Sequence, residues 1–552
     1  MGPQTEFKKG RLLAIIGLVI GCALPAYSGP QPCARCHPSQ VQGFLATPMG
    51  RSLGPPGRGP SGSFYHAVSG TRFSVRRSSP DHMTQRMERG GLASQYSIAY
   101  SVGSGAHAVA YLVEVGNHLF ESPLSYYARF GWGISPGYEN LKAPDFNRAV
   151  RPQCLFCHSG QTLPISGTLN AYRKPAFAAE AITCERCHGP TTEHLRNPVP
   201  GSIVNPARLP PRARDSVCEQ CHLGGEVPVP NPGKQITDFH AGENLEDVFT
   251  VYVYQSSRDS TEQKALAIIS QSQQLALSKC ARSSGGKLWC GTCHDPHALP
   301  KDSVGYFRAR CLNCHGTALL TSHPKPNQNC FGCHMPRLPA GQGGHTIFTD
   351  HRIAIYTPKE LARLRAASLV GGNTPASSDD ELIPWHDPPP QFAERNLGLA
   401  YARVGEQLEW FPFTRRAYQL LASASNDFPN DPVLLRAMGQ IISGTKAEAD
   451  ADVLFDKALA VEPDSSLIYY DKAVAAEQAG DANNAINYFE KTLQLDPWLV
   501  DPYQRLAQLY TANAQLSLAQ QTYVRFLKAF PESIEAKREV FRRSGQSKPN
   551  KK

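Results

Sequence analysis

Two cysteines three positions apart, with a histidine directly after the second, recur seven times in this chain of 552 residues. The copies use 14 of its 16 cysteines: Cys33, Cys36 and His37; Cys154, Cys157 and His158; Cys184, Cys187 and His188; Cys218, Cys221 and His222; Cys290, Cys293 and His294; Cys311, Cys314 and His315; and Cys330, Cys333 and His334. Two thiols one helical turn apart can each form a thioether with a vinyl group of haem, and the adjacent imidazole then reaches the iron. The spacing therefore predicts seven covalently attached c-type haems, bound by these cysteines and ligated by these histidines.

Two other chemistries also use closely spaced cysteines. Zinc ribbons contain C-x-x-C pairs, but they do not need a histidine directly after each pair. A disulfide framework does not consist of seven such pairs, each followed by histidine. The invariable histidine favours haem over both.

Each haem iron has a second axial position, and its occupant decides what the iron can do. A histidine or methionine there gives an electron carrier, whereas an open position gives a reductase or a sensor. Eleven of the 18 histidines lie outside the motifs. Seven of these, which flank motifs or lie in the cysteine-free stretch after the first motif, are the expected second ligands: His66, His107, His194, His297, His323, His345 and His351. Four histidines are reserves (His82, His118, His240 and His386), and Met49 is the alternative second ligand of the first haem.

Residues 1–28 have the pattern of an export signal. Basic residues precede an apolar run from Leu12 to Leu24 that is too short to span a bilayer comfortably. Cleavage before Gly29 is one expectation, and a lipid anchor at Cys22 in "VIGC" is the alternative. No other apolar run reaches transmembrane length. Because haem is attached to this motif after export in bacteria, we expect an exported protein that is periplasmic or associated with the outer membrane.

The formal net charge of +9 does not indicate a nucleic-acid partner. Part of it lies in the export signal and the lysine-rich tail, and haem propionates would lower it further. Arginine and lysine are more simply explained as propionate partners and solvated surface.

Composition divides the chain into five segments. Short alternating runs and a turn at Gly116-Asn117 predict a small antiparallel sheet after the first motif, and a helix is expected near 257–278. A linker rich in Pro and Gly separates the motifs from the C-terminal part. The segments are 1–28 (signal), 29–150 (first motif and β-rich segment), 151–370 (six motifs), 371–390 (linker) and 391–545 (repeats).

The haem motifs leave little chain for a protein core. About 46 residues are available per haem between Cys33 and His351. We therefore expect the macrocycles to supply much of the core and to lie close together.

The last segment has a period of 34 residues. The recurring positions are Pro429, Pro463, Pro497 and Pro531; Ala451, Ala485 and Ala519; and Phe455, Phe489 and Tyr523. This is the tetratricopeptide period, in which small residues stand where paired helices cross. The predicted fold class is thus multidomain: a sparse mixed α/β multihaem cytochrome c domain followed by an all-α tetratricopeptide-repeat solenoid.

Several stretches make the chain resemble exported bacterial multihaem cytochromes that end in tetratricopeptide repeats: "CARCHPSQVQGFLATPMGRS", "YSVGSGAHA", "CERCHGP", "CGTCHDPH", "CFGCHMP" and "HTIFTDHRI". The haem region is also similar to the tetrahaem cytochromes of ammonia oxidation and the doubled C-x-x-C-H group. The resemblance implies covalent haem c, close-packed haems and electron transfer, and it implies no substrate. In the ammonia-oxidation cytochromes a histidine commonly follows the first motif where this chain has Met49.

We therefore expect a heptahaem electron carrier whose repeats dock a redox partner protein. The alternative is a multihaem reductase or oxidase of small nitrogen or sulfur compounds, with one open haem. Multihaem nitrite reductases often mark their active haem with C-x-x-C-K, and the sequence contains no such motif. We therefore predict no catalytic residue and favour the carrier.

Overall fold

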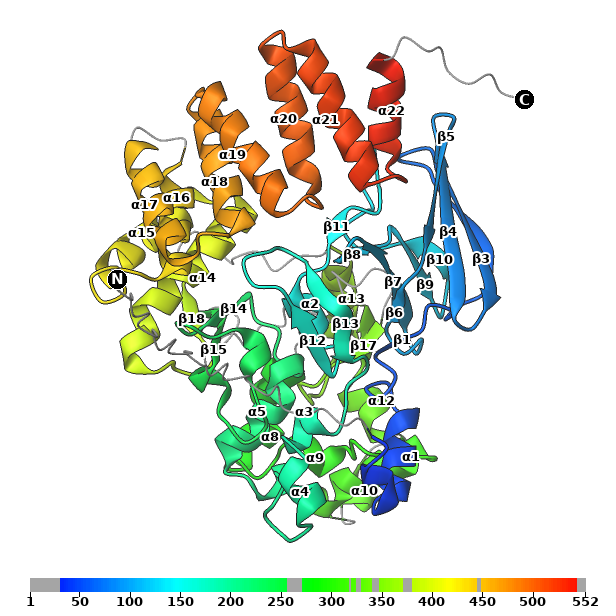
Figure 1. The fold of residues 1–552 in the computed structure, drawn as a ribbon. Coiled ribbons are helices and arrows are strands. Elements are labelled where there is room, and N and C mark those ends of the chain that lie inside the picture. Colours follow the sequence, from blue (N-terminus) through cyan, green and yellow to red (C-terminus); the bar gives the residue numbers. More distant parts are fainter. Residues whose placement is uncertain are drawn as a thin grey trace, which may run out of the picture.

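The computed structural model describes residues 30–255, 271–316, 319–323, 329–339, 347–370, 380–443 and 448–543. The predicted export signal with Cys22, the candidate ligand His345 and most of the predicted helix 257–278 lie outside the described residues. The repeats form an arc along one side of the molecule, and the strands of the first segment lie beneath its last helices (Figure 1).

The segment after the first motif is rich in antiparallel strands, as predicted. A four-stranded sheet has the order β2-β3-β4-β5, and a seven-stranded sheet has the order β1-β6-β7-β8-β11, with β9 on β7 and β10 on β9. The expected turn at Gly116-Asn117 joins β7 to β8, since Val115 pairs with His118. The elements are η1 (Cys33–Arg35), α1 (Pro38–Ala46), β1 (Leu53–Gly54), β2 (Gly62–His66), β3 (Thr71–Ser79), β4 (His82–Arg89), β5 (Leu92–Ser97), β6 (Tyr100–Val102), β7 (Ala108–Val115), β8 (His118–Glu121), β9 (Leu124–Tyr127), β10 (Gly131–Ile134) and β11 (Arg148–Ala149).

Short helices and small sheets make up the segment with six motifs. The fourth and sixth motifs end longer helices, α5 and α10, and the other motifs lie in or beside single turns of helix. The elements are α2 (Pro152–Phe156), β12 (Gln161–Pro164), β13 (Tyr172–Ala179), α3 (Glu185–His188), α4 (Thr192–Arg196), η2 (Pro206–Arg208), α5 (Pro211–His222), β14 (Val227–Pro230), η3 (Ile236–Asp238), η4 (Leu245–Asp247), β15 (Phe249–Tyr254), α7 (Gln271–Leu277), α8 (Lys279–Ser283), α9 (Cys290–Cys293), α10 (Ser303–His315), α11 (Leu319–Ser322), α12 (Cys330–His334), β16 (Arg337–Pro339), β17 (Ile347–Thr349) and α13 (Pro358–Val370).

Part of the predicted linker belongs to the folded protein. Strand β18 (Leu382–Pro384) pairs with β15 and completes the sheet β14-β15-β18. A short helix, η5 (Pro390–Phe392), follows directly before the repeats. Residues 380–390 are therefore a structured junction and not a free linker, because backbone hydrogen bonds of β18 hold them to the motif region.

The C-terminal part is the predicted all-α repeat array. Its helices pair in sequence, and the recurring Ala451, Ala485, Ala519, Phe455 and Phe489 are all fully buried. The helices are α14 (Ala393–Leu408), α15 (Phe411–Ala424), α16 (Pro432–Ile442), α17 (Glu448–Val461), α18 (Ser466–Gln478), α19 (Ala482–Leu495), α20 (Val500–Ala512), α21 (Leu516–Ala529) and α22 (Ile534–Arg543).

Turns between successive repeats contact the rest of the chain in reverse order. The hydroxyl of Ser466 donates to the backbone oxygen of Gly167 at 3.2 Å. Two repeats later along the array, the carboxylate of Glu532 accepts from the backbone N–H of Gln95 at 2.9 Å. Later repeats thus lie against earlier segments of the chain, and the array extends along one side of the molecule (Figure 1).

A third contact is made by the repeat turn that lies between these two along the chain, and it is the most deeply buried. Nε2 of His118 lies 2.9 Å from Oδ1 of Asp496, and both side chains are almost inaccessible. A side chain at Gly116 would lie 2.2 Å from the indole of Trp498, so this tight turn lets the repeat approach. The reserve ligand His118 is therefore part of the interface with the repeats.

Two hydrophobic clusters join the repeats to the preceding segments. One combines strand residues such as Phe120 with Phe526 and Phe530 of the repeats, and the rings of Phe120 and Phe530 are 5.7 Å apart. The other combines residues of the β14-β15-β18 sheet, such as Tyr254, with α14 to α18. The repeats and the strands consequently share a core.

Candidate cofactor site

One cavity of about 2370 Å³ is lined by residues from all seven motifs. It is more than twice the roughly 300–1,000 Å³ typical of a pocket for one small ligand. Of the 21 motif residues, only Cys154, His158 and Cys314 do not line it. The tertiary structure therefore gathers motifs that are spread over 300 residues of sequence around one space.

Thiols of different motifs lie close enough to interact directly. Among the described residues all cysteines are free of disulfides. Contacts between thiols join the first motif to the third, the second to the fourth, the fourth to the fifth and the sixth to the seventh: Cys33 with Cys184, Cys157 with Cys221, Cys218 with Cys290, and Cys311 with Cys330. Cys187 is within electrostatic reach of Cys221, and Cys293 of Cys314. The motifs consequently lie in the order 1-3-4-5-6-7, with the second beside the fourth.

Four motif histidines each lie next to one of the predicted second ligands. Metal–imidazole bonds are about 2.0 Å long and each ring centre lies about 1.1 Å beyond its nitrogen, so two imidazoles on one ion have centres about 6 Å apart. The observed centre-to-centre distances are 6.4 Å for His37 and His194, 5.8 Å for His188 and His297, 6.3 Å for His294 and His351, and 6.2 Å for His334 and His323. These separations match the spacing that a shared metal ion needs.

In several of these histidines, Nδ1 contacts a neighbouring group of the protein. Nδ1 of His188 donates to the Val204 oxygen at 2.8 Å, and Nδ1 of His334 to the Ala354 oxygen at 3.0 Å. This contact fixes the tautomer and leaves Nε2 as the acceptor nitrogen, an arrangement that is common for histidines that bind metals. Similar Nδ1 contacts hold His194 (Ser202, 2.9 Å), His351 (Thr349, 2.9 Å), His297 (Asp295, 3.3 Å) and His222 (Gln271, 3.4 Å).

Burial favours the neutral form of several of these rings. It lowers the pKa of His188, His294 and His351, and charges on neighbouring histidines lower the pKa of His188 and His294 further. Neutral imidazole is the form that binds a metal. The surroundings thus favour the ligating state at neutral pH.

The lining also fits the carboxylates of haem. Five of its side chains are basic and two are acidic: Arg186, Lys279, Arg282, Arg310 and Arg352 against Glu226 and Asp295. Buried polar atoms without a partner point to further ligand groups, since Nε of Arg186 and Oε1 of Gln220 make no hydrogen bond within the described chain. An excess of cations beside unsatisfied polar atoms suits propionates.

A simple metal site is a poorer fit. No group of three or more His, Cys, Asp or Glu side chains in the described ranges has the arrangement of a metal-ion site. A haem iron requires only two axial ligands from the protein, because the porphyrin supplies the other four nitrogens. The facing histidine pairs satisfy that requirement.

His66 is not brought to the motifs. It ends β2, and both ring nitrogens are engaged, Nδ1 with Ser69 at 2.8 Å and Nε2 with the Glu139 oxygen at 2.9 Å. A ring whose Nε2 is occupied in this way has no free nitrogen for iron. The geometry therefore argues against the expected ligand role of His66.

The structure brings two other predicted second ligands to the cavity without pairing them with a motif histidine. His107 and Met49 both line the cavity, and the ring of His107 is 5.5 Å from Phe348. His194 and not Met49 faces the ring of His37. Within the described residues, His158, His222 and His315 are not paired with a second histidine.

Sequence reasoning missed the polar residues inside the motifs. Arg186 and Gln220 stand between the paired cysteines of the third and fourth motifs and are buried, and the guanidinium of Arg186 lies 4.0 Å from the ring centre of Phe156. Large polar residues at both variable positions of a C-x-x-C pair were the available signal, visible as "CERC" and "CEQC".

Comparisons with known proteins identify the repeats. A family model described as tetratricopeptide repeat matches residues 476–538. None of the curated proteins matches the chain. Within the described residues, each helix is too short or too polar to cross a lipid bilayer.

Solved structures resemble only about a quarter of the chain. MamA of Desulfovibrio magneticus RS-1, from residue 41 to its end, is 19% identical over 28% of this chain and 78% of its own, with a TM-score of 0.22. Another MamA crystal structure is 18% identical over 27% of this chain and 82% of its own, with a TM-score of 0.23. The APC/C hetero-tetramer Cut9–Hcn1 is 20% identical over 26% of this chain and 29% of that one, with a TM-score of 0.23.

Proposed function

We propose that this protein is a c-type cytochrome with seven haems that carries electrons between redox partners. The observation that carries the proposal is the set of four histidine pairs, each 5.8–6.4 Å apart, beside motif thiols in one cavity. Bound haem iron would supply reversible one-electron chemistry. The cysteines of each motif would hold the porphyrin, and the paired imidazoles would close both axial positions.

The order of the motifs supports transport over reaction. Contacts and electrostatic reach between thiols link six motifs into one continuous series, and the second motif branches from it at the fourth. Two imidazoles on an iron leave no position for a substrate. The histidine pairs at the first, third, fifth and seventh motifs therefore favour electron transfer over substrate binding at those four haems.

The repeats add a protein-contact module. Tetratricopeptide repeats mediate contacts between proteins, and in this chain one edge of the array already contacts the protein's own strands. The surface away from that edge is where we propose that a redox partner binds. We also propose that the protein works after export, because thioether attachment takes place there in bacteria.

The first test is the number and state of the haems. Pyridine haemochrome assay and intact mass of the matured protein should both give seven haems, and the double variant C330A/C333A should give six. Five or fewer in the unchanged protein would contradict the assignment of all seven motifs.

The second test separates the carrier from a reductase. Replacing His194 by Ala opens one iron, so a high-spin ferric band should appear in H194A. The control H66A should keep the spectrum of the unchanged protein, because both ring nitrogens of His66 are already hydrogen-bonded. Rapid carbon monoxide binding by the unchanged protein, with turnover of a nitrogen or sulfur compound, would instead support the reductase.

A further inference from the structure

A buried carboxylate stands inside the fourth motif but faces away from the cavity. Glu219 lies between Cys218 and Cys221 on α5 and is 7% exposed. Its neighbours Cys218 and Gln220 line the cavity, and Glu219 does not. A carboxylate in this position is costly to bury unless other groups compensate its charge.

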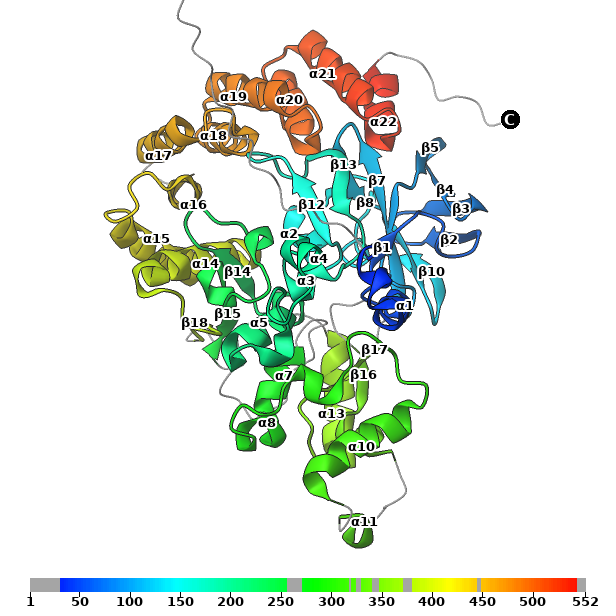
Figure 2. The same ribbon diagram turned by 60° about the horizontal axis from the view of Figure 1, so that its bottom comes forward.

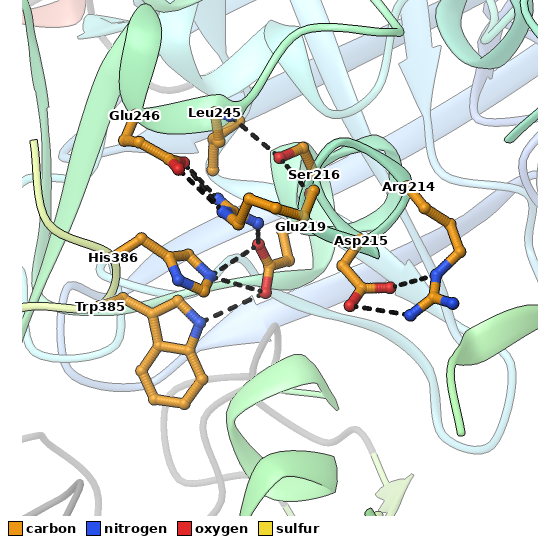
Figure 3. A network of polar contacts seen from close by, with 9 residues as sticks. Arg214, Asp215, Ser216, Glu219, Leu245, Glu246, Trp385 and His386 are labelled. Carbon is orange, nitrogen blue, oxygen red and sulfur yellow. Dashed lines mark hydrogen bonds and ion pairs between the residues drawn. The ribbon is translucent and has the colours of Figure 1, made fainter. Parts of the chain in front are cut away.

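Three side chains satisfy that carboxylate. Nη1 of Arg212 donates to Oε2 at 2.6 Å. Nε1 of Trp385 donates to Oε1 at 3.3 Å, and Nε2 of His386 lies 3.1 Å from Oε2 (Figure 3). Because an ionised carboxylate only accepts hydrogen bonds, Nε2 of His386 is the donor in this contact.

Two carboxylates of this cluster compete for one arginine. Arg212 is shared with a second carboxylate, Glu246, to which Nη2 donates at 2.5 Å. Burial raises the pKa of Glu219, but the hydrogen bond from His386 and the charge of Arg212 outweigh it, so its pKa is lowered. Glu219 thus shares its arginine partner with Glu246.

The groups that hold Glu219 come from the junction with the repeats. Trp385 and His386 lie between β18 and α14, the first repeat helix. The junction is fixed on both sides, because β18 pairs with β15 and Arg395 of α14 donates to the Pro230 oxygen at 2.8 Å. Docking of the repeats thus determines which donors reach the carboxylate.

We propose that Glu219 is a positioning residue that lowers the reduction potential of the haem at the fourth motif, and that the junction residues Trp385 and His386 set the size of this effect. The inference rests on the proposed function. A fixed negative charge favours the ferric state, which is the more positive one, and charges interact more strongly inside a protein than in water. Glu219 would act on the haem through its charge, from its position between Cys218 and Cys221, without touching the iron.

The test uses the full haem-loaded chain and a spectroelectrochemical titration at pH 7. In E219Q, which keeps the shape and removes the charge, one reduction step should move to higher potential. The control is D215N on the same helix, because Asp215 is 41% exposed and paired with Arg214 at 2.8 Å. This variant should move the same step less than E219Q does, since water and the guanidinium screen its charge.

A second variant has the opposite expected sign. W385F keeps all charges but removes one donor to Glu219, so the same step should move to lower potential. If E219Q did not accumulate, W385F alone would decide between a downward shift, which supports the proposal, and no shift, which overturns it.

Two outcomes would overturn the proposal directly. Equal shifts in E219Q and D215N would mean that any carboxylate on α5 has this effect. An unchanged potential in E219Q with a lower melting temperature would mean that Glu219 only holds the helix in place. Failure of the proposed function is distinguishable, because the haem count of the unchanged protein is measured before the titration.

Discussion

The motif region and the repeats differ in how many of their own side chains are buried. Every described repeat helix from α14 to α21 packs on its neighbours, and side chains such as Phe455, Phe489 and Phe526 fill the array. By contrast, α10 of the sixth motif has 13 residues and none of them is buried. In Figures 1 and 2, α10 lies at the end of the molecule opposite the repeats. The part around the last three motifs, which borders a cavity and buries few side chains, depends on what fills that cavity.

The difference teaches where stability originates. Burial of apolar surface contributes roughly 25 cal/mol per Å². The repeats obtain this contribution from their own side chains, whereas α9, α10 and α12 contain no buried residue in the described chain. We expect the porphyrins to supply the missing apolar surface there.

The largest effect is expected when haem is withheld. A chain without its first 28 residues, produced where no thioethers form, should keep helical repeats but lose the fold around the last three motifs. Limited proteolysis with mass spectrometry should find cuts within residues 271–339, whereas the haem-loaded protein should resist them. Equal resistance of both forms would show that the motif region has a sufficient core of its own.

Removal of the repeats should have the next largest effect. A chain that ends at residue 390 exposes the shared clusters, so we expect it to aggregate or to retain fewer haems than the full chain. The matched control is a chain that ends at residue 543, which keeps every repeat helix. A soluble product of the shorter chain with seven haems would show that the motif region is independent, as the sequence alone implied.

A single buried contact between the two regions should have a smaller effect. Loss of His118 removes the side chain beside Oδ1 of the buried Asp496, and leaving a buried polar group less well satisfied costs about 1–3 kcal/mol. The free energy of unfolding of H118A should fall by about this amount in denaturant titrations. H82A is the control, because His82 is an exposed histidine at the start of β4; equal losses in the two variants would contradict the role of the interface.

The smallest effect concerns pH and Asp145. Burial raises the pKa of this carboxyl to about 6, and its contact with the backbone of Ile534 lies at the start of the last repeat helix. The folded protein then binds a proton more tightly than the unfolded chain, so stability falls as pH rises from about 4 to 6, by at most about 3 kcal/mol. D145N should flatten this slope in melts at several pH values, and an unchanged slope would assign it to another group.

The sequence determined the units of the protein. Spacing within each motif is local covalent chemistry, so all seven motifs could be read without a structure. The repeat register was equally accessible, because alanine and phenylalanine at a 34-residue period mark where paired helices must cross. The Gly116-Asn117 turn and its antiparallel sheet belong to the same class of local signal.

The tertiary structure alone decided which units meet. Of His66 and His194, only His194 lies next to a motif ring, because α4 places it beside the first motif whereas β2 places His66 against Glu139. In the same way, no local pattern indicated that Trp498 packs on Gly116 or that Trp385 donates to Glu219. Such contacts join residues more than 160 positions apart, and their free energy depends on packing of the whole chain and not on the propensity of any segment.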